Sequence, residues 1–226
     1  MAVVDCTTSD SIDQLVESLQ VTFSSAAKEA IELELRHTIR EFCVRTHAWT
    51  TFLSLQIKEG VTVYGITPEE NEAEVCLVIA VAIDSSPIAG WSGDYLPSSN
   101  RRGGSSYVTN EDRLITDQIT EITLDSTHVT DTNKSLVVTL ALRPKKKLLF
   151  IPDMLGFDFF DTLLSGASTR LQSHTNRPYT DPEGAKTNRR EFLAGLVIAR
   201  EKTKARFGKL TSPWVYPRMA PGRQYR

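Results

Sequence analysis

The side chains that most often carry catalysis are scattered along this sequence. The four histidines, His37, His47, His128 and His174, fall in unrelated segments. The sequence has no P-loop for phosphate, no serine nucleophile motif and no HExxH zinc motif. The glutamates paired between positions 69 and 74 fall in an expected turn, where solvated surface explains them best. We therefore predict that the chain is not an enzyme and holds no cofactor and no metal.

The cysteines argue against both a disulfide framework and a zinc site. Cys6, Cys43 and Cys76 are odd in number and share no CxxC spacing. This usage is typical of a reducing compartment. The longest unbroken apolar run is Val75 to Ile83, whereas a membrane-spanning helix needs about 20 residues. We expect a soluble, intracellular protein without a secretory signal and without a membrane partner.

The densest basic run is Arg143, Lys145, Lys146 and Lys147, interrupted by Pro144. Such a cluster could contact DNA phosphates or another partner, with an affinity that falls as salt rises. It has no interleaved aromatic residues, so the base stacking of a single-strand binder is not expected. The alternative is an exposed strand edge that the lysines protect from aggregation.

The C-terminal tail, Lys209 to Arg226, combines aromatic and basic residues with three prolines. Tryptophan, tyrosine and arginine dominate interface hot spots, and proline lowers the entropy cost of docking an extended chain. The tail is therefore either an arm that binds a partner or a segment that folds back on its own subunit. The residues expected to bind in the first case are Trp214, Tyr216, Pro217, Arg218, Arg223, Tyr225 and Arg226.

Charge is distributed unevenly along the 226 residues, 40% of which are hydrophobic and 24% charged. Residues 1–100 hold 15 acidic and 5 basic residues, whereas residues 143–226 hold 7 acidic and 17 basic residues. The two halves could neutralise each other within one fold or between neighbouring copies.

The N-terminal segment, about residues 9 to 48, has a helical pattern. A short helix is expected from Asp10 to Leu19, and Ser24 or Ser25 is expected to cap a longer helix. The buried stripe of that helix is predicted at three- and four-residue steps, namely Ala27, Ile31, Leu35, Ile39, Phe42 and Cys43.

The middle segment is rich in valine, threonine and isoleucine and predicts four to six antiparallel strands. The expected strands include residues 61–64, 75–83, 115–124 and 136–142, and the 115–124 stretch alternates poorly enough to require a bulge or an edge position. Residues 97–106 are expected to form a loop.

Helical patterns return after Pro152. One helix is expected from there to about His174, and a second begins at Asp181-Pro182-Glu183 and ends near Phe207-Gly208. We therefore predict an α+β fold in three parts. Residues 1–50 and 152–208 form a helical bundle core, residues 51–151 form an inserted antiparallel β-rich domain, and residues 209–226 form an extended C-terminal arm.

Two stretches carry a family resemblance. The first helix ends in Arg40-Glu41-Phe42-Cys43-Val44-Arg45-Thr46, and residues 161–171 (DTLLSGASTRL) are followed by Arg177-Pro178-Tyr179-Thr180-Asp181-Pro182 and by residues 190–200 (REFLAGLVIAR). In this order they resemble the head-to-tail adaptor (connector) proteins of bacteriophages. The similarity covers roughly residues 25–48 and 150–205.

The resemblance implies a structural role in the virion. Such adaptors form a ring, typically a dodecamer, that joins the portal protein to the tail nozzle or tail tube and leaves a channel for packaged DNA. Their C-terminal arm inserts into the portal, which is the role implied for residues 211–226 here. The implied location is the head–tail junction of a virion assembled in the host cytoplasm.

Two other functions remain open at this point. A tail terminator or other neck protein would bind tail components and never touch the portal. A nucleic-acid-binding module would use the basic run and the basic C-terminal third, and its binding to duplex DNA would depend steeply on salt.

Overall fold

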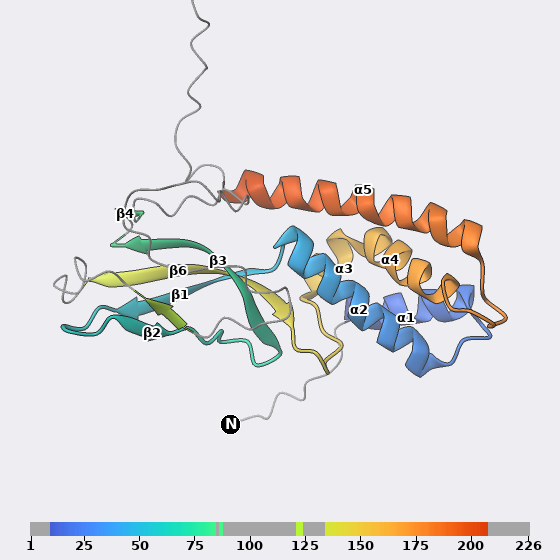
Figure 1. Ribbon diagram of the computed structural model, residues 1–226, viewed down its shortest axis with the longest axis horizontal. Helices are drawn as coiled ribbons and strands as arrows, with labels where there is room; N and C mark the ends of the chain where they lie inside the picture. The colour runs from blue at the N-terminus through green and yellow to red at the C-terminus, as the bar shows by residue number, and fades with distance from the viewer. Residues whose placement is uncertain (1–9, 85, 88–120, 124–133, 208–226) are drawn as a thin grey trace, which may run out of the picture.

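The computed structural model has an α+β fold in which helices gather at one end and an antiparallel sheet at the other (Figure 1). It describes residues 10–84, 86–87, 121–123 and 134–207. The helices come from both ends of the described chain, and most of the sheet comes from the middle. The predicted fold class is confirmed.

The first two helices form a hairpin, α1 (Asp10–Thr22) and α2 (Lys28–Thr46). Ile31, Leu35 and Ile39 of α2 are fully buried, as their spacing predicts. The predicted serine cap is wrong, because the residue before α2 is Ala27 and makes no side-chain capping bond. Residues 23–26 turn instead, with the Ala26 amide donating to the Phe23 carbonyl oxygen at 2.8 Å, so the serines lie too early to cap α2.

The segment after Pro152 forms two helices where one was predicted, α3 (Asp153–Asp158) and α4 (Phe160–Gln172). Phe159 lies between the two helices and has a non-helical backbone, with φ −123° and ψ 25°. Its ring is buried and lies 5.0 Å from the Phe42 ring, centroid to centroid. In a continuous helix the Phe159 ring would point in the direction set by the helical period. We therefore attribute the break to the packing of this ring against α2.

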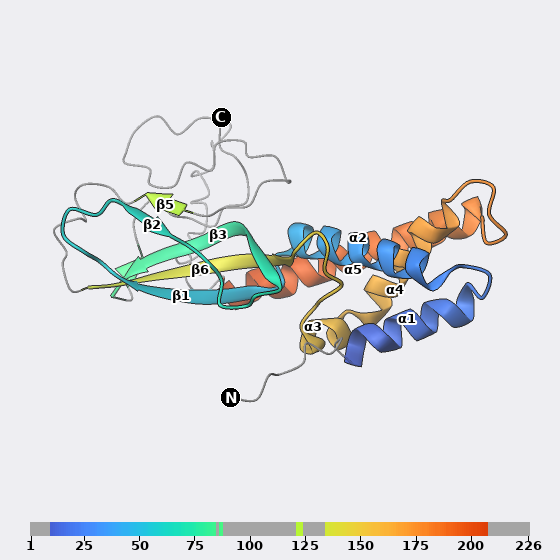
Figure 2. The same cartoon turned by 90° about the horizontal axis from the view of Figure 1, so that it is seen from below.

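The last helix, α5 (Pro182–Phe207), begins and ends where the sequence predicts. The Asp181 carboxylate accepts a hydrogen bond from the Gly184 amide at 3.0 Å, which caps the helix. One side of α5 is buried along its length, namely Ala185, Phe192, Leu196, Ala199 and Thr203. This stripe packs on α2 and α4, so α5 forms one side of the helical end (Figures 1 and 2).

The main sheet has the strand order β1 (Thr50–Gln56), β6 (Ser135–Pro144), β3 (Ala73–Ile83) and β4 (Ser86–Pro87), all antiparallel. The sequence pattern did not single out β1. Two register shifts in β3, between Val75 and Leu77 and between Val78 and Ala80, explain why its buried residues do not alternate.

A separate pair joins β2 (Val63–Gly65) to β5 (Glu121–Thr123). Of the strand predicted at 115–124, only these three β5 residues lie within the described chain. The loop predicted at 97–106 lies outside the described residues.

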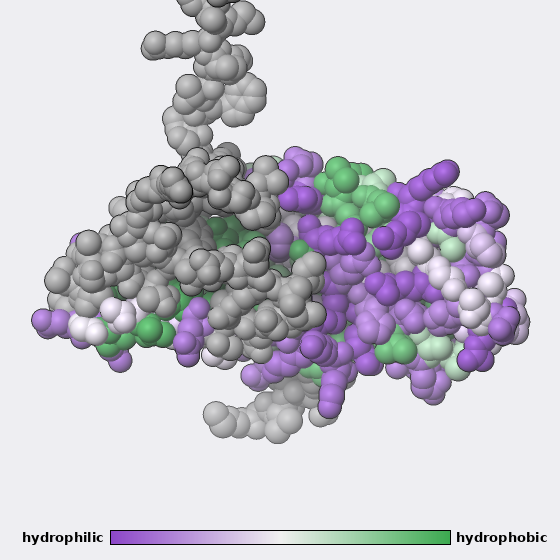
Figure 3. Space-filling model, in the orientation of Figure 1, coloured by the Kyte–Doolittle hydropathy of each residue, from purple (hydrophilic) through white to green (hydrophobic). Residues whose placement is uncertain are grey.

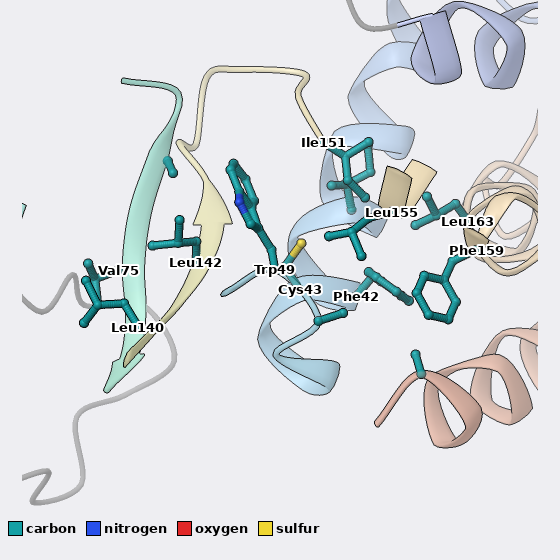
Figure 4. Packing of buried hydrophobic residues seen from close by; sticks show 14 of the residues in the cluster. Phe42, Cys43, Trp49, Val75, Leu140, Leu142, Ile151, Leu155, Phe159 and Leu163 are labelled. Carbon is teal, nitrogen blue, oxygen red and sulfur yellow. The ribbon is translucent and has the colours of Figure 1, made fainter. Parts of the chain in front are cut away.

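One hydrophobic cluster runs through both ends of the molecule. Figure 4 shows Trp49 between Leu140 and Leu142 of the sheet and the helical residues Cys43 and Phe42. The indole is buried and lies 5.6 Å from the Phe150 ring, centroid to centroid. Trp49 therefore joins the sheet core to the helical core. Among the described helices, none is long and apolar enough to cross a membrane.

Candidate functional site

The predicted basic run is divided by the structure. Lys145, Lys146 and Lys147 follow β6 and are exposed. Arg143 does not belong with them, because its side chain is 3% exposed and its Nε donates to Glu74 Oε1 at 2.7 Å. Its side chain is therefore committed to the interior, so its assignment as a partner-facing or DNA-facing residue is wrong.

The predicted portal-binding residues lie outside the described chain. Trp214, Tyr216, Pro217, Arg218, Arg223, Tyr225 and Arg226 all fall in residues 208–226. The structure fixes where their segment starts, since α5 ends at Phe207.

A buried ionic cluster joins the helices to the sheet. Glu74 Oε1 on β3 accepts hydrogen bonds from Arg143 Nε at 2.7 Å and from Arg40 Nη2 at 2.8 Å. Arg40, on α2, also donates to the Pro144 carbonyl oxygen. One carboxylate thus compensates two guanidinium groups at a place where water has little access. The cluster fixes the distance and angle between α2 and the β3–β6 pair.

The thiols near this junction are unreactive. Burial raises the pKa of Cys43 far above its usual value, and burial is also the main reason why the pKa of Cys76 rises to about 12. Cys76 Sγ donates to the Ala141 carbonyl oxygen at 3.3 Å. Because the thiolate is the nucleophilic form, neither cysteine is suited to catalysis at neutral pH.

His47 closes α2 in a left-handed conformation, with φ 51°. Its amide donates to the Cys43 carbonyl oxygen at 2.9 Å, which ends the helix just before β1. Burial, with a smaller contribution from Arg200, lowers the pKa of His47 to about 4. The imidazole is therefore neutral at physiological pH, which suits a structural residue.

A second ionic cluster lies among the helices and is more exposed. Arg170 Nη2 on α4 donates to Glu41 Oε2 at 2.7 Å, and its Nη1 lies 3.9 Å from Glu34 Oε2. Glu34 also contacts His174 Nε2 at 3.0 Å. Arg170 is 34% exposed, so solvent screens this cluster more than the one around Glu74.

The Arg177–Pro182 turn between α4 and α5 is held at several points. The Tyr179 ring packs edge-on against Phe23 at 6.3 Å between centroids, and its hydroxyl lies 3.3 Å from His174 Nδ1. The Thr180 hydroxyl donates to the His174 carbonyl oxygen at 2.6 Å. Together with the Asp181 cap, these contacts fix the direction in which α5 leaves the turn.

Small residues let the helices approach closely. A Cβ added at Gly166 would lie 2.5 Å from Thr38 Cγ2 and 2.7 Å from the Phe192 ring. One added at Gly195 would lie 2.2 Å from Thr162 Oγ1. In the segments that carry the family resemblance, Phe42, Cys43, Ala167, Phe192 and Ala199 are buried, whereas Leu164 is half-buried.

One surface was missed by the sequence reasoning, the outer face of α5. Leu193, Val197 and Ile198 are 39%, 62% and 57% exposed. Figure 3 shows an apolar patch over α5 with polar residues on either side. The sequence indicates this surface, because the apolar run from Phe192 to Ala199 covers two helical turns. A single buried stripe accounts for only some of these residues, so the others must lie on the outer side of the helix.

The contacts of these described residues are packing, helix caps and ion pairs. Within the described ranges, no group of three or more histidine, cysteine, aspartate or glutamate side chains is placed to hold a metal ion. Compared with known proteins, the chain matches no protein-family model and no curated protein sequence.

Proposed function

We propose that this chain is a structural protein of a bacteriophage virion, a head-to-tail adaptor that forms a ring between the portal and the tail. One observation carries the proposal. The residues that resemble the adaptor motifs lie on α2, α4 and α5, which pack on one another, and Phe42, Ala167 and Phe192 are buried between these helices and their neighbours. Residues that maintain a scaffold suit a protein whose work is mechanical.

The shape of α5 supports the role of the tail as an arm. At 1.5 Å per residue its 26 residues form a rod of about 40 Å. The Asp181 cap and the packed turn hold one end of this rod, and the proposed arm, residues 209–226, starts two residues beyond the other end. An arm on such a rod would leave each subunit from a defined position.

The arm would bind the portal through large side chains and charges. Trp214 and Tyr216 would fill apolar pockets, and Arg218, Arg223 and Arg226 would pair with carboxylates or carbonyl oxygens. The exposed Lys145, Lys146 and Lys147 would supply non-specific contact with packaged DNA.

The proposal is tested by removing the arm. A chain ending at Leu210 should keep its circular dichroism spectrum and melting temperature but lose binding to purified portal rings. The double variant Trp214→Ala/Tyr216→Ala should lower portal affinity by about a hundredfold. A Lys145→Ala/Lys146→Ala/Lys147→Ala variant serves as the control and should bind the portal as the unmodified chain does.

Other outcomes would contradict the proposal. If deletion of residues 211–226 unfolds the protein, the tail is part of its own subunit and not an arm. If the full chain binds tail-tube components and never the portal, it is a tail-side neck protein. If the monomer binds duplex DNA tightly and portal not at all, it is a nucleic-acid-binding module.

A further inference from the structure

The outer face of α5 has the composition of an interface. Its centre is apolar, with the exposed Leu193, Val197 and Ile198 side by side over two turns. Charged residues flank this centre along the helix, among them Arg190 and Lys204. An exposed apolar centre with a charged rim is typical of surfaces that another protein covers.

The charge of α5 indicates what kind of surface covers it. The helix carries seven basic residues and three acidic ones. The chain's own tail is an unsuitable occupant, because residues 209–226 carry four basic residues and no acidic ones. Two of the lysines pair with glutamates of α5 itself, Lys186 with Glu183 and Lys204 with Glu201, but the helix keeps a net positive charge. Like charges would repel, so an acidic surface that also offers an apolar side chain suits this face best.

The outer face of α1 is acidic over its first two turns and ends in one exposed apolar side chain, Val21. The helix carries Asp10, Asp13 and Glu17 and no basic residue. Asp10, Glu17 and Val21 are all exposed and recur at seven- and four-residue steps, which places them on one side of the helix. Val21 is 84% exposed, the most of any large apolar side chain whose surroundings the structure describes.

The two faces belong to different sides of the molecule. Helix α1 packs on α2, α3 and α4, whereas α5 packs on α2 and α4. In Figures 1 and 2, α4 lies between α1 and α5. One copy therefore cannot bring its own two faces together.

We propose that the outer face of α5 in one copy of this chain packs on the outer face of α1 in a second copy. The contact joins unlike surfaces, so every copy that uses its α5 face still offers its α1 face to another copy. Repetition of such a contact closes into a ring when the rotation per subunit divides a full turn. The inference rests on the proposed function, to which it adds the contact between neighbouring subunits.

Cross-linking of the full chain tests which faces meet. Val197→Cys and Val21→Cys would each be made in a Cys6→Ser background, and the Cys6→Ser parent serves as the control for Cys43 and Cys76. A short bismaleimide should link chains in a mixture of the two variants, with mass spectrometry locating the bond between positions 197 and 21. Either variant alone should give no more product than the parent.

Two results would overturn the inference. Strong cross-linking of either variant with itself would mean that like faces meet. Absence of the 197–21 product, whether the chain forms oligomers by other surfaces or stays monomeric at millimolar concentration, would mean that these faces are not in contact.

A charge placed in the patch gives a second measure. Val197→Asp should weaken self-association by about tenfold or more in sedimentation experiments. Phe52→Asp is the matched control, since Phe52 is 64% exposed on β1 at the other end of the molecule, and it should change nothing. Equal weakening by both substitutions would contradict the assignment.

The result can be separated from the proposed function by the portal-binding assay. If Val197→Asp leaves the portal affinity of the arm intact, loss of oligomers reports on the subunit contact alone. If the unmodified chain shows the 197–21 product but never binds a portal, the contact stands and the adaptor function fails.

Discussion

The helical end of the molecule and its attachment to the sheet are held together by different physical means. The helices meet through apolar side chains and glycines, with Gly166 against the Phe192 ring and Gly195 against Thr162. The attachment to the sheet depends on Trp49 and on a buried carboxylate between Arg40 and Arg143. Close packing therefore dominates the first region, whereas the second combines the packing of Trp49 with a buried charge. We therefore expect the second to be the more sensitive to single substitutions and to pH.

The largest effect is expected at Glu74. Glu74→Gln keeps the shape of the side chain but removes the negative charge that Arg40 and Arg143 share. The free energy of unfolding should fall by about 3–5 kcal/mol in a urea titration. Glu59→Gln, at an exposed position, is the control and should cost less than about 0.5 kcal/mol. A loss at Glu74 as small as the loss at Glu59 would mean that the junction does not depend on this charge.

The next effect concerns pH and His47. The unfolded imidazole binds a proton with a pKa near 6.5, whereas burial lowers the folded pKa to about 4. The unfolded state therefore binds more protons between these values. The free energy of unfolding is therefore highest above about pH 6.5. It falls as the pH drops toward about 4, by no more than about 3 kcal/mol.

The contribution of His47 can be isolated by substitution. Asparagine also tolerates the left-handed conformation at this position, so His47→Asn should keep the fold and flatten the dependence of stability on pH between about 4 and 6.5. His37→Asn, at an exposed position of α2, should leave that dependence in place. An unchanged slope in His47→Asn would show that other groups cause it.

A smaller loss is expected in the helical end at Gly166. The Cβ of Gly166→Ala would meet Thr38 and the Phe192 ring at less than 3 Å, so α2 or α5 must shift. The free energy of unfolding should fall by about 1–3 kcal/mol. Gly65→Ala has open space around the added Cβ and should change stability by less than about 0.5 kcal/mol in the same thermal or urea titration. Equal effects would argue against close helix packing.

The smallest effect is expected at Arg170. Its ion pair with Glu41 is short, but the side chain is 34% exposed and solvent screens it. Arg170→Ala should cost less than about 1 kcal/mol, and the difference should shrink further as NaCl is raised. A loss as large as that of Glu74→Gln would contradict the contrast between the exposed and the buried ionic cluster.

The parts of the fold that the sequence predicts are those with strong local signals. The three- and four-residue steps of α2 predicted a buried stripe that is confirmed from Ile31 to Cys43, whereas Ala27 precedes the helix and is exposed. Asp181-Pro182 correctly marked the start of α5. The break at Phe159 was missed because it arises from packing against Phe42, which is distant in sequence. The burial of Arg143 was missed for the same reason, since a run of basic residues does not reveal that Glu74 lies opposite one of them.

The candidate interfaces were predicted only in part. The tail was recognisable from its composition, but its residues lie outside the described chain and remain a prediction. The outer face of α5 was not recognised, because a sequence run does not state which of its apolar residues other helices will cover. The structure shows that Phe192 and Leu196 are buried against other helices, whereas Val197 and Ile198 are exposed.

The adaptor function is tested most directly by electron microscopy of the purified chain, alone and mixed with a candidate portal protein. We expect rings of this protein stacked on the portal, and portals without them when residues 211–226 are deleted. Portals that stay undecorated by the full-length chain, under conditions where it is folded and soluble, would contradict the adaptor function.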